Sequence, residues 1–207
     1  MRTRGKVCGI TRESDAIAAA RHGADAIGFI LWRPSPRYVE PERAGAIAAL
    51  LPAFVPPVCV FVNPSVGEVE AVLRHVPWAT LQFHGEELPA FCAQFGRPYI
   101  KAVRMRPGVD LIEYLGQYTG AAAWLVDAFD ESTYGGTGSP FDWNLLPRAL
   151  PRPWLLSGGL TVDIVAEAVR RLSPWGVDVS SGVESAKGIK DAEKIAAFIA
   201  GVRNADV

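Results

Sequence analysis

The sequence has few of the groups that build disulfide frameworks or metal centres. It contains only three cysteines, Cys8, Cys59 and Cys92, and three histidines in 207 residues. An odd number of scattered cysteines argues against a disulfide framework and fits a reducing cytoplasm. No cysteine pair has the spacing of a zinc site, and the histidines lie far apart in the sequence. We therefore expect neither structural disulfides nor a bound metal.

Long hydrophobic runs and an excess of one charge are also missing. No stretch approaches the roughly 18 consecutive apolar residues of a membrane-spanning helix, and the first residues do not resemble a signal peptide. The net charge is −1, so there is no basic surplus to neutralise a nucleic-acid backbone. We expect a cytoplasmic protein that binds neither membranes nor nucleic acids.

What the sequence does contain is a regular alternation of two kinds of segment. Short apolar runs typical of buried parallel strands lie at 6–8, 26–30, 58–62, 79–83, 99–103, 124–126, 154–156 and 177–179. Segments with helical spacing lie at 13–21, 41–51, 66–74, 161–172 and 191–202. Eight strands at intervals of about 25 residues predict a single α/β domain over residues 1–207, a (β/α)8 TIM barrel with little decoration.

The alternative fold, an open doubly wound sheet that binds a dinucleotide, normally carries a G-x-G-x-x-G turn after its first strand. Here the first strand continues as Cys8-Gly9-Ile10-Thr11, which does not fit. Neither a Walker motif nor a nucleophile elbow is present. We therefore expect no cofactor.

Several residues are predicted to define helix ends. Ser65 precedes Glu68 at the spacing of a capping box, and Thr161 is a candidate N-cap for the helix that follows it. The glycine at Gly23 is expected to end the first helix, because glycine adopts the left-handed conformation without strain.

In a barrel of this kind, the reactive groups lie at the carboxyl ends of the strands. Small residues follow the last two predicted strands: Gly158, Gly159, Ser180, Ser181 and Gly182. Their backbone N–H groups predict a phosphate site, although each turn taken singly could be a plain tight turn. The loop at 135–138, Gly-Gly-Thr-Gly, adds a candidate lid or a further part of the phosphate cradle.

Cys8 is the candidate base or nucleophile. Lys6 lies two residues earlier on the same face of the strand, and a nearby ammonium would lower the pKa of the thiol; the alternative is a buried apolar cysteine, as expected for Cys59 and Cys92. Asp127, at the end of the sixth strand, is the candidate acid, because partial burial there would favour its protonated form. The alternative for Asp127 is a helix cap or an ion pair.

Other strand ends supply candidate binding groups. Arg37 presents a planar fork suited to a carboxylate or a phosphate, or it is a solvated loop charge. His84 follows the fourth strand, where a hydrogen bond to a loop is the simpler interpretation. Asp178 lies in the eighth strand. The residues alone therefore predict cofactor-free acid–base chemistry on a phosphorylated small molecule.

The combination of motifs resembles the phosphoribosylanthranilate isomerases of tryptophan biosynthesis over residues 6–195. The motifs are Lys6-Val7-Cys8-Gly9-Ile10-Thr11, Ser35-Pro36-Arg37-Tyr38, Val60-Phe61-Val62-Asn63, Gln82-Phe83-His84-Gly85, Gly135-Gly136-Thr137-Gly138, Phe141-Asp142-Trp143, Ser157-Gly158-Gly159-Leu160 and the run from Gly176 to Glu184. No single motif would be specific, but their order along the chain is.

The resemblance implies an Amadori rearrangement of N-(5-phosphoribosyl)anthranilate to 1-(2-carboxyphenylamino)-1-deoxyribulose 5-phosphate. It implies that Asp127 is the general acid, that Cys8 is the general base and that Arg37 lies near the anthranilate. The turns at 158–159 and 180–182 would hold the phosphate. His84 and Asp178 match pocket positions of the family.

Three other functions compete with this interpretation. The related isomerase of histidine biosynthesis typically uses two aspartates, so Cys8 argues against it. A non-catalytic phosphate-binding barrel would not need Cys8, Asp127 and Arg37 together. An indole-synthesising barrel would need a lysine and glutamate set and a longer N-terminal extension. The partner predicted is a small phosphosugar, and the chain is expected to be a monomer or a homodimer.

Overall fold

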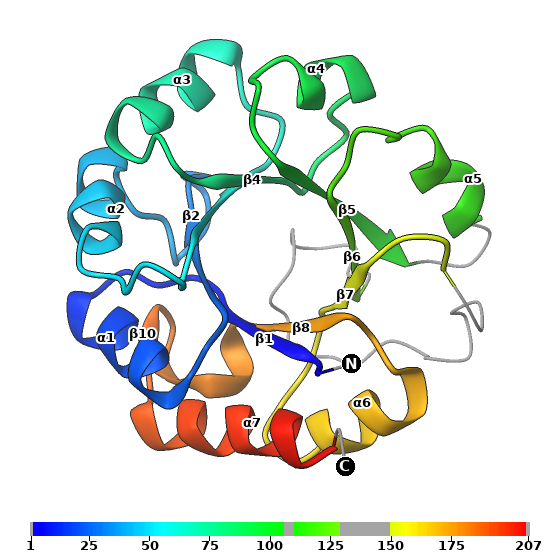
Figure 1. The fold of residues 1–207 in the computed structure, drawn as a ribbon. Coiled ribbons are helices and arrows are strands. Elements are labelled where there is room, and N and C mark those ends of the chain that lie inside the picture. The colour runs from blue at the N-terminus through cyan, green and yellow to red at the C-terminus, as the bar shows by residue number, and fades with distance from the viewer. Residues whose placement is uncertain (1, 106–109, 129–149, 206–207) are drawn as a thin grey trace.

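The computed structural model describes residues 2–105, 110–128 and 150–205. Eight parallel strands close into a barrel in chain order, as Figure 1 shows along the barrel axis. The strands are β1 (Arg4–Val7), β2 (Ala26–Ile30), β3 (Pro57–Phe61), β4 (Thr80–Phe83), β5 (Tyr99–Met105), β6 (Ala123–Ala128), β7 (Trp154–Leu156) and β8 (Gly176–Val179). The predicted (β/α)8 barrel is thus confirmed.

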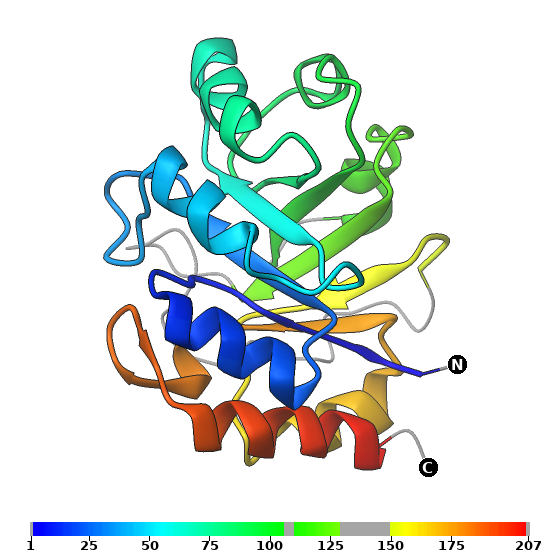
Figure 2. The same cartoon turned by 60° about the vertical axis from the view of Figure 1, so that its left-hand side comes forward.

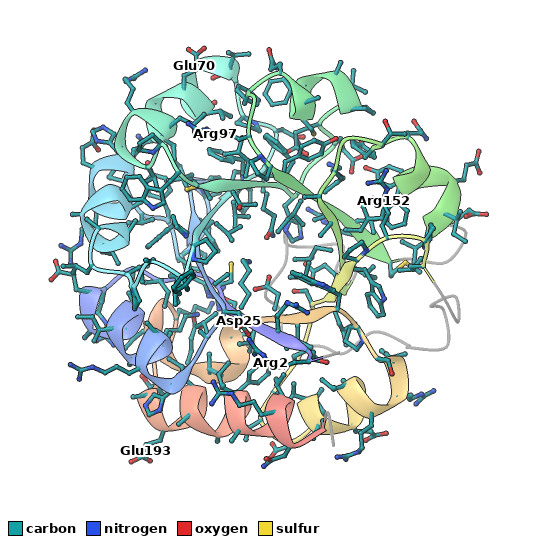
Figure 3. The ribbon with its side chains drawn as sticks, viewed as in Figure 1. Arg2, Asp25, Glu70, Arg97, Arg152 and Glu193 are labelled. Atoms are coloured by element: carbon teal, nitrogen blue, oxygen red, sulfur yellow. The ribbon has the colours of Figure 1, made fainter. Side chains whose placement is uncertain are left out.

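Helices cover the outside of this barrel (Figures 1 and 2). They are α1 (Glu13–His22), α2 (Pro41–Ala48), α3 (Val66–His75), α4 (Pro89–Ala93), α5 (Leu111–Gly116), α6 (Val165–Leu172) and α7 (Ala192–Ala205). A short 3-10 turn, η2 (Ser181–Val183), and a hairpin of β9 (Glu184–Ala186) and β10 (Ile189–Lys190) follow β8. Charged side chains such as Glu70 and Glu193 point outward from the helices (Figure 3).

The helix-end predictions have mixed outcomes. The capping box at α3 is confirmed: the N–H of Glu68 donates to Ser65 Oγ at 3.3 Å, and the N–H of Ser65 donates to Glu68 Oε2 at 2.7 Å. Gly23 ends α1 with φ +89°, as expected. The prediction for Thr161 is wrong, because residues 162–164 form a turn and α6 begins only at Val165.

The strands alternate between two packing environments, as the period-2 geometry of a strand requires. One set of side chains packs outward against the helices and includes Phe29, Phe61, Phe83 and Cys59. The other set forms a smaller apolar cluster, made of Val58, Ile100, Ala102, Ala123, Leu125 and Leu155. On β3, β5, β6 and β7 this cluster occupies the early inward positions, so polar inward side chains are found nearer the strand ends.

The three cysteines are free and buried. Cys59 and Cys92 belong to the large cluster between barrel and helices, which is the apolar role expected of them. Burial raises the pKa of both thiols to about 12. Cys8, by contrast, follows directly after β1. No helix in the described part of the chain is long and apolar enough to cross a membrane.

Candidate active site at the carboxyl ends of the strands

The described candidate residues all lie at one end of the barrel. Cys8 follows β1, Arg37 lies between β2 and α2, His84 follows β4, Asp127 lies near the end of β6, and Asp178 lies within β8. The parallel topology brings these strand ends together, as the sequence predicted. The predicted loop at 135–138 lies outside the described residues.

The first group joins β1 to β8. Lys6 Nζ donates to Asp178 Oδ1 at 2.9 Å, and the two side chains are only 2% and 6% exposed. Desolvation lowers the pKa of Lys6, but the neighbouring Asp178 and Cys8 outweigh it and raise that pKa overall. The ammonium therefore stays charged beneath the strand ends.

The environment of Cys8 differs from the sequence prediction in one respect. Burial raises the pKa of the Cys8 thiol, and the opposing effects of Lys6 and Lys190 do not reverse the shift. Lys6 does lower the pKa of Cys8, as expected, but its effect is smaller than that of burial. Asp178, which the prediction did not consider here, also raises the pKa of Cys8.

The thiol of Cys8 has room because β2 carries a glycine beside it. A Cβ atom at Gly28 would lie 2.5 Å from Cys8 Sγ and 2.9 Å from Cys8 Cα, closer than van der Waals contact allows. Any larger residue at position 28 would therefore push the thiol out of its place.

The second group joins β4 to β6. His84 Nε2 lies 2.9 Å from Asp127 Oδ2, and Gln82 Nε2 lies 3.2 Å from His84 Nδ1. The side chains of His84 and Asp127 are 11% and 3% exposed. His84 therefore bonds to the candidate acid, not to a loop as the simpler interpretation held. Sequence spacing gave no signal for this contact, since 43 residues separate the pair.

Arg37 has a buried, ion-paired guanidinium, so it is not a solvated loop charge. Its Nε and Nη2 donate to Glu184 Oε1 and Oε2 at 2.7 and 2.8 Å, and its side chain is 9% exposed. Glu184 also accepts from Lys190 Nζ at 2.8 Å. From the sequence, Glu184 stood out only as part of a motif and Lys190 was not a candidate, because neither residue lies at a strand end of the barrel.

The two predicted phosphate turns lie beside each other. Gly158 and Gly159 adopt left-handed conformations, with φ of +88° and +68°. A Cβ atom at Gly182 would collide with the carbonyl oxygen of Leu160, so the turn after β8 lies against the segment that follows β7. Ser180, Ser181 and the glycines are all half-buried. Backbone N–H groups and two serine hydroxyls are thus available to an anion at this corner.

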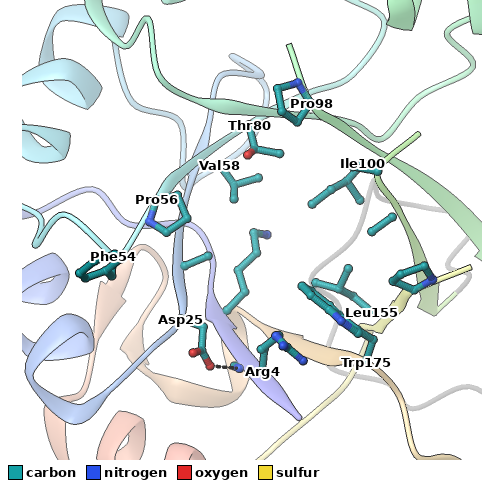
Figure 4. Close-up of a pocket in the computed structure, with 16 residues that line it drawn as sticks. Arg4, Asp25, Phe54, Pro56, Val58, Thr80, Pro98, Ile100, Leu155 and Trp175 are labelled. Atoms are coloured by element: carbon teal, nitrogen blue, oxygen red, sulfur yellow. Dashed lines mark hydrogen bonds between the residues drawn. The ribbon is translucent and has the colours of Figure 1, made fainter. Parts of the chain in front are cut away.

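A separate cavity opens at the opposite end of the barrel (Figure 4). Its volume is about 510 Å³, and its walls come from the first residues of the strands, such as Val58, Thr80, Ile100 and Leu155, with Phe54 and Trp175 also on its lining. The lining is mostly apolar and includes the stem of Lys6. None of the predicted catalytic or phosphate-binding residues lines it, so we place the candidate site at the carboxyl ends.

The closed parallel barrel and the polar groups gathered at its carboxyl ends define a (β/α)8 barrel protein with the site position typical of barrel enzymes. The sequence model of the family described as N-(5'-phosphoribosyl)anthranilate (PRA) isomerase matches residues 5–201. The chain belongs to this family.

Individual relatives agree with the family match. An N-(5'-phosphoribosyl)anthranilate isomerase from Nitrosospira multiformis is 54% identical over 202 residues, which are 98% of this chain and 97% of the relative. A solved phosphoribosyl anthranilate isomerase in complex with reduced 1-(o-carboxyphenylamino)-1-deoxyribulose 5-phosphate is 36% identical, with a TM-score of 0.84 over 98% of this chain and 99% of that one. A structure of monomers of the dimeric enzyme from Thermotoga maritima is 35% identical, with a TM-score of 0.84 and the same coverage.

Proposed function

We propose that this chain is an isomerase of tryptophan biosynthesis that converts N-(5'-phosphoribosyl)anthranilate into 1-(o-carboxyphenylamino)-1-deoxyribulose 5-phosphate. The observation that carries the proposal is the family match over residues 5–201. The presence of Cys8, Asp127 and Arg37 at one end of the same barrel supports it. The reaction is an internal redox rearrangement of an aldose derivative to a ketose derivative, so it proceeds by proton transfers and needs no external oxidant.

In the first step, Asp127 acts as the general acid. It protonates the ribose ring oxygen, the bond from this oxygen to C1′ breaks, and the nitrogen lone pair forms a C1′=N iminium. For this step the pair of Asp127 and His84 has to hold a proton on the carboxyl. Gln82 Oε1 has no hydrogen-bond partner among the described residues. When the Gln82 amide is turned so that Oε1 accepts from His84 Nδ1–H, His84 Nε2 carries no proton and accepts from the Asp127 carboxyl.

In the second step, Cys8 acts as the general base. The iminium makes the C2′ hydrogen acidic, and the thiolate removes this proton. The C–H electrons form the C1′=C2′ bond while the C1′=N π electrons return to nitrogen, which gives an enolamine. Addition of a proton to C1′ and loss of the proton from the C2′ hydroxyl then give the ketone at C2′. Lys6 stabilises the thiolate by its charge, and Lys190 contributes in the same direction.

We propose that three further regions hold the substrate ends. Arg37 lies against the anthranilate, and the backbone of Gly158, Gly159, Ser180, Ser181 and Gly182 holds the phosphate. His84 and Asp178 contact the substrate between these ends or orient the groups that do. Rigid binding of both ends supplies the part of the rate enhancement that proton transfer does not.

Turnover of the purified protein tests the proposal directly. We expect phosphoribosylanthranilate to be converted into the ketose product at a rate typical of enzymes, as measured by chromatographic separation of substrate and product. The aminoaldose substrate of histidine biosynthesis, which undergoes the same rearrangement, is the matched comparison. Turnover of that compound alone would overturn the assignment, and turnover of both would show a bifunctional enzyme.

The charges around Cys8 predict opposite shifts in the pH profile for two substitutions. The base must be a thiolate, so kcat/KM rises with pH as the thiol loses its proton. Lys6→Met removes a charge that lowers the pKa of Cys8 and should move this rise to higher pH, whereas Asp178→Asn removes a charge that raises it and should move the rise to lower pH. Shifts in the same direction for both variants would contradict the electrostatic role of this pair.

We propose that the chain acts in the cytoplasm as a monomer or a homodimer. Its three free cysteines suit a reducing compartment. The Thermotoga maritima relative is dimeric, and sedimentation at working concentration decides between the two states for this chain.

A further inference from the structure

One buried carboxylate at the mouth of the barrel contacts two cations that belong to different parts of the site. Glu184 accepts from Arg37 through both oxygens and from Lys190 at 2.8 Å. The side chains of Glu184 and Lys190 are 6% and 0% exposed. Burial favours the protonated form of Glu184, but the contacts with Arg37 and Lys190 outweigh it and hold the pKa of this carboxyl below its usual value.

The first arm of this cluster leads to the group proposed for the anthranilate end. Glu184 takes the Nε and Nη2 edge of Arg37. A guanidinium has five N–H groups, so this contact leaves the end-on edge available to a substrate carboxylate. Glu184 thereby fixes the plane and direction of Arg37, and it does so without competing for the edge that the substrate would use.

The second arm leads to the proposed phosphate turn. Lys190 Nζ donates to the carbonyl oxygen of Ser180 at 3.0 Å and lies 3.3 Å from Ser180 Oγ. Ser180 is the first residue of the turn after β8. The ammonium is fully buried, so its contacts with Ser180 are not exchanged for water. The position of Lys190 therefore determines where the backbone of this turn lies.

The hairpin that carries these residues is bonded to the loop after β1 and to the first turn of α1. Thr11 Oγ1 donates to the carbonyl oxygen of Gly188 at 2.7 Å, and the N–H of Lys190 donates to Asp15 Oδ2 at 3.0 Å. Asp15 is itself paired with Arg12. The cluster is thus anchored to the barrel on the side of Cys8, and it does not move with the hairpin alone.

We propose that Glu184 and Lys190 are positioning residues that set the distance between the carboxylate-binding and phosphate-binding ends of the site. Glu184 serves both ends, because it holds Arg37 directly and holds Ser180 through Lys190. Of these two ends, Lys190 contacts only the phosphate end directly. This inference rests on the proposed function for the identity of the two ends, but the contacts that carry it do not depend on turnover.

Two substitutions separate the arms. Glu184→Gln keeps the shape of the side chain and removes its charge, so both arms loosen. We expect KM for phosphoribosylanthranilate to rise by about tenfold or more while kcat falls less, since misplaced binding groups weaken the hold on the substrate ends. Lys190→Met removes the contacts of Lys190 with Ser180 and with Glu184, and it leaves the contact between Arg37 and Glu184 in place.

Binding of two fragments measures each end without turnover. Inorganic phosphate reports the Ser180 turn and anthranilate reports Arg37, both titrated by calorimetry or NMR. We expect Glu184→Gln to weaken both fragments by about fivefold or more, and Lys190→Met to weaken phosphate to that extent while anthranilate changes by less than about twofold. If Lys190→Met does not fold, the two fragment affinities of Glu184→Gln carry the test.

Lys101→Met is the matched control. Lys101, on β5, is another fully buried lysine, and it pairs with Glu87 at 2.7 Å. β5 lies across the barrel from β1. Its loss should lower the unfolding midpoint and leave phosphate affinity within about twofold of the parent. The proposal is overturned if Glu184→Gln binds both fragments as the parent does, if Lys190→Met binds phosphate normally, or if Lys101→Met weakens phosphate equally. Absence of turnover in the parent chain would overturn the proposed function and leave the fragment result to be judged by itself.

Discussion

Replacing Cys8 with alanine is expected to lower kcat for phosphoribosylanthranilate by about 10²–10⁴-fold, the usual contribution of a positioned general base. The thiolate is the group proposed to take the C2′ proton, and the two cations that act on it, Lys6 and Lys190, cannot accept one. KM should change much less than kcat, since the substrate ends are held elsewhere. Single-turnover measurements separate the chemical step from binding.

Cys59→Ala is the matched control for this substitution. Cys59 lies on β3 in the cluster that faces the helices, so its loss costs packing and lowers the unfolding midpoint without touching the site. We expect its kcat to stay within about twofold of the parent. Near-normal turnover by Cys8→Ala would show that another group removes the proton and would refute the assignment of the base.

Asp127→Asn is expected to lower kcat to a similar degree, about 10²–10⁴-fold, because a carboxamide cannot donate the proton that opens the ribose ring. The substitution keeps the size of the side chain, and the amide can still hydrogen-bond to His84 Nε2, 2.9 Å away in the parent. The fold and the fragment affinities should therefore be retained. For a substrate analogue whose ring is already open, the loss of kcat in this variant should be much smaller than for the natural substrate.

Asp110→Asn provides the control for loss of a carboxylate. Asp110 caps α5 by accepting from the N–H groups of Ile112 and Glu113, and asparagine caps a helix about equally well. Stability and turnover should thus both stay near the parent values. If Asp127→Asn behaved like Asp110→Asn, Asp127 would have only a structural role.

Much of the barrel could be predicted because its signals are local. Each strand is a short apolar run, and period-2 alternation separates Cys59, which packs outward, from Val58 and Val60 on the same strand. Helix α3 begins at a capping box that four residues encode. A helix was expected around Cys92, which lies in α4, but without bounds, and α5 was not predicted, because helices of five and six residues are too short to show helical spacing.

The site was predicted less completely, for a different reason. The strand-end position of Cys8 and Asp127 follows from topology, so sequence alone indicates that they share one face. The contacts of these residues depend on how the barrel closes. His84, after β4, contacts Asp127 on β6, and Asp178 on β8 pairs with Lys6 on the neighbouring strand β1. Glu184 and Lys190 lie in a hairpin outside the barrel strands, where neither periodicity nor a strand-end rule points to them.

The side chain of Lys6 has a wider consequence for how this barrel tolerates change. Its stem borders the apolar cavity of the opposite face, and its ammonium lies among the charges of the candidate site. Sequence variation in the cavity walls can therefore alter stability, solubility or self-association while the acid and base stay where they are. Substitutions that displace Lys6 are expected to transmit such a change through the barrel to Cys8. Through Lys6, the packing of the cavity at one end of the barrel bears on the placement of Cys8 at the other.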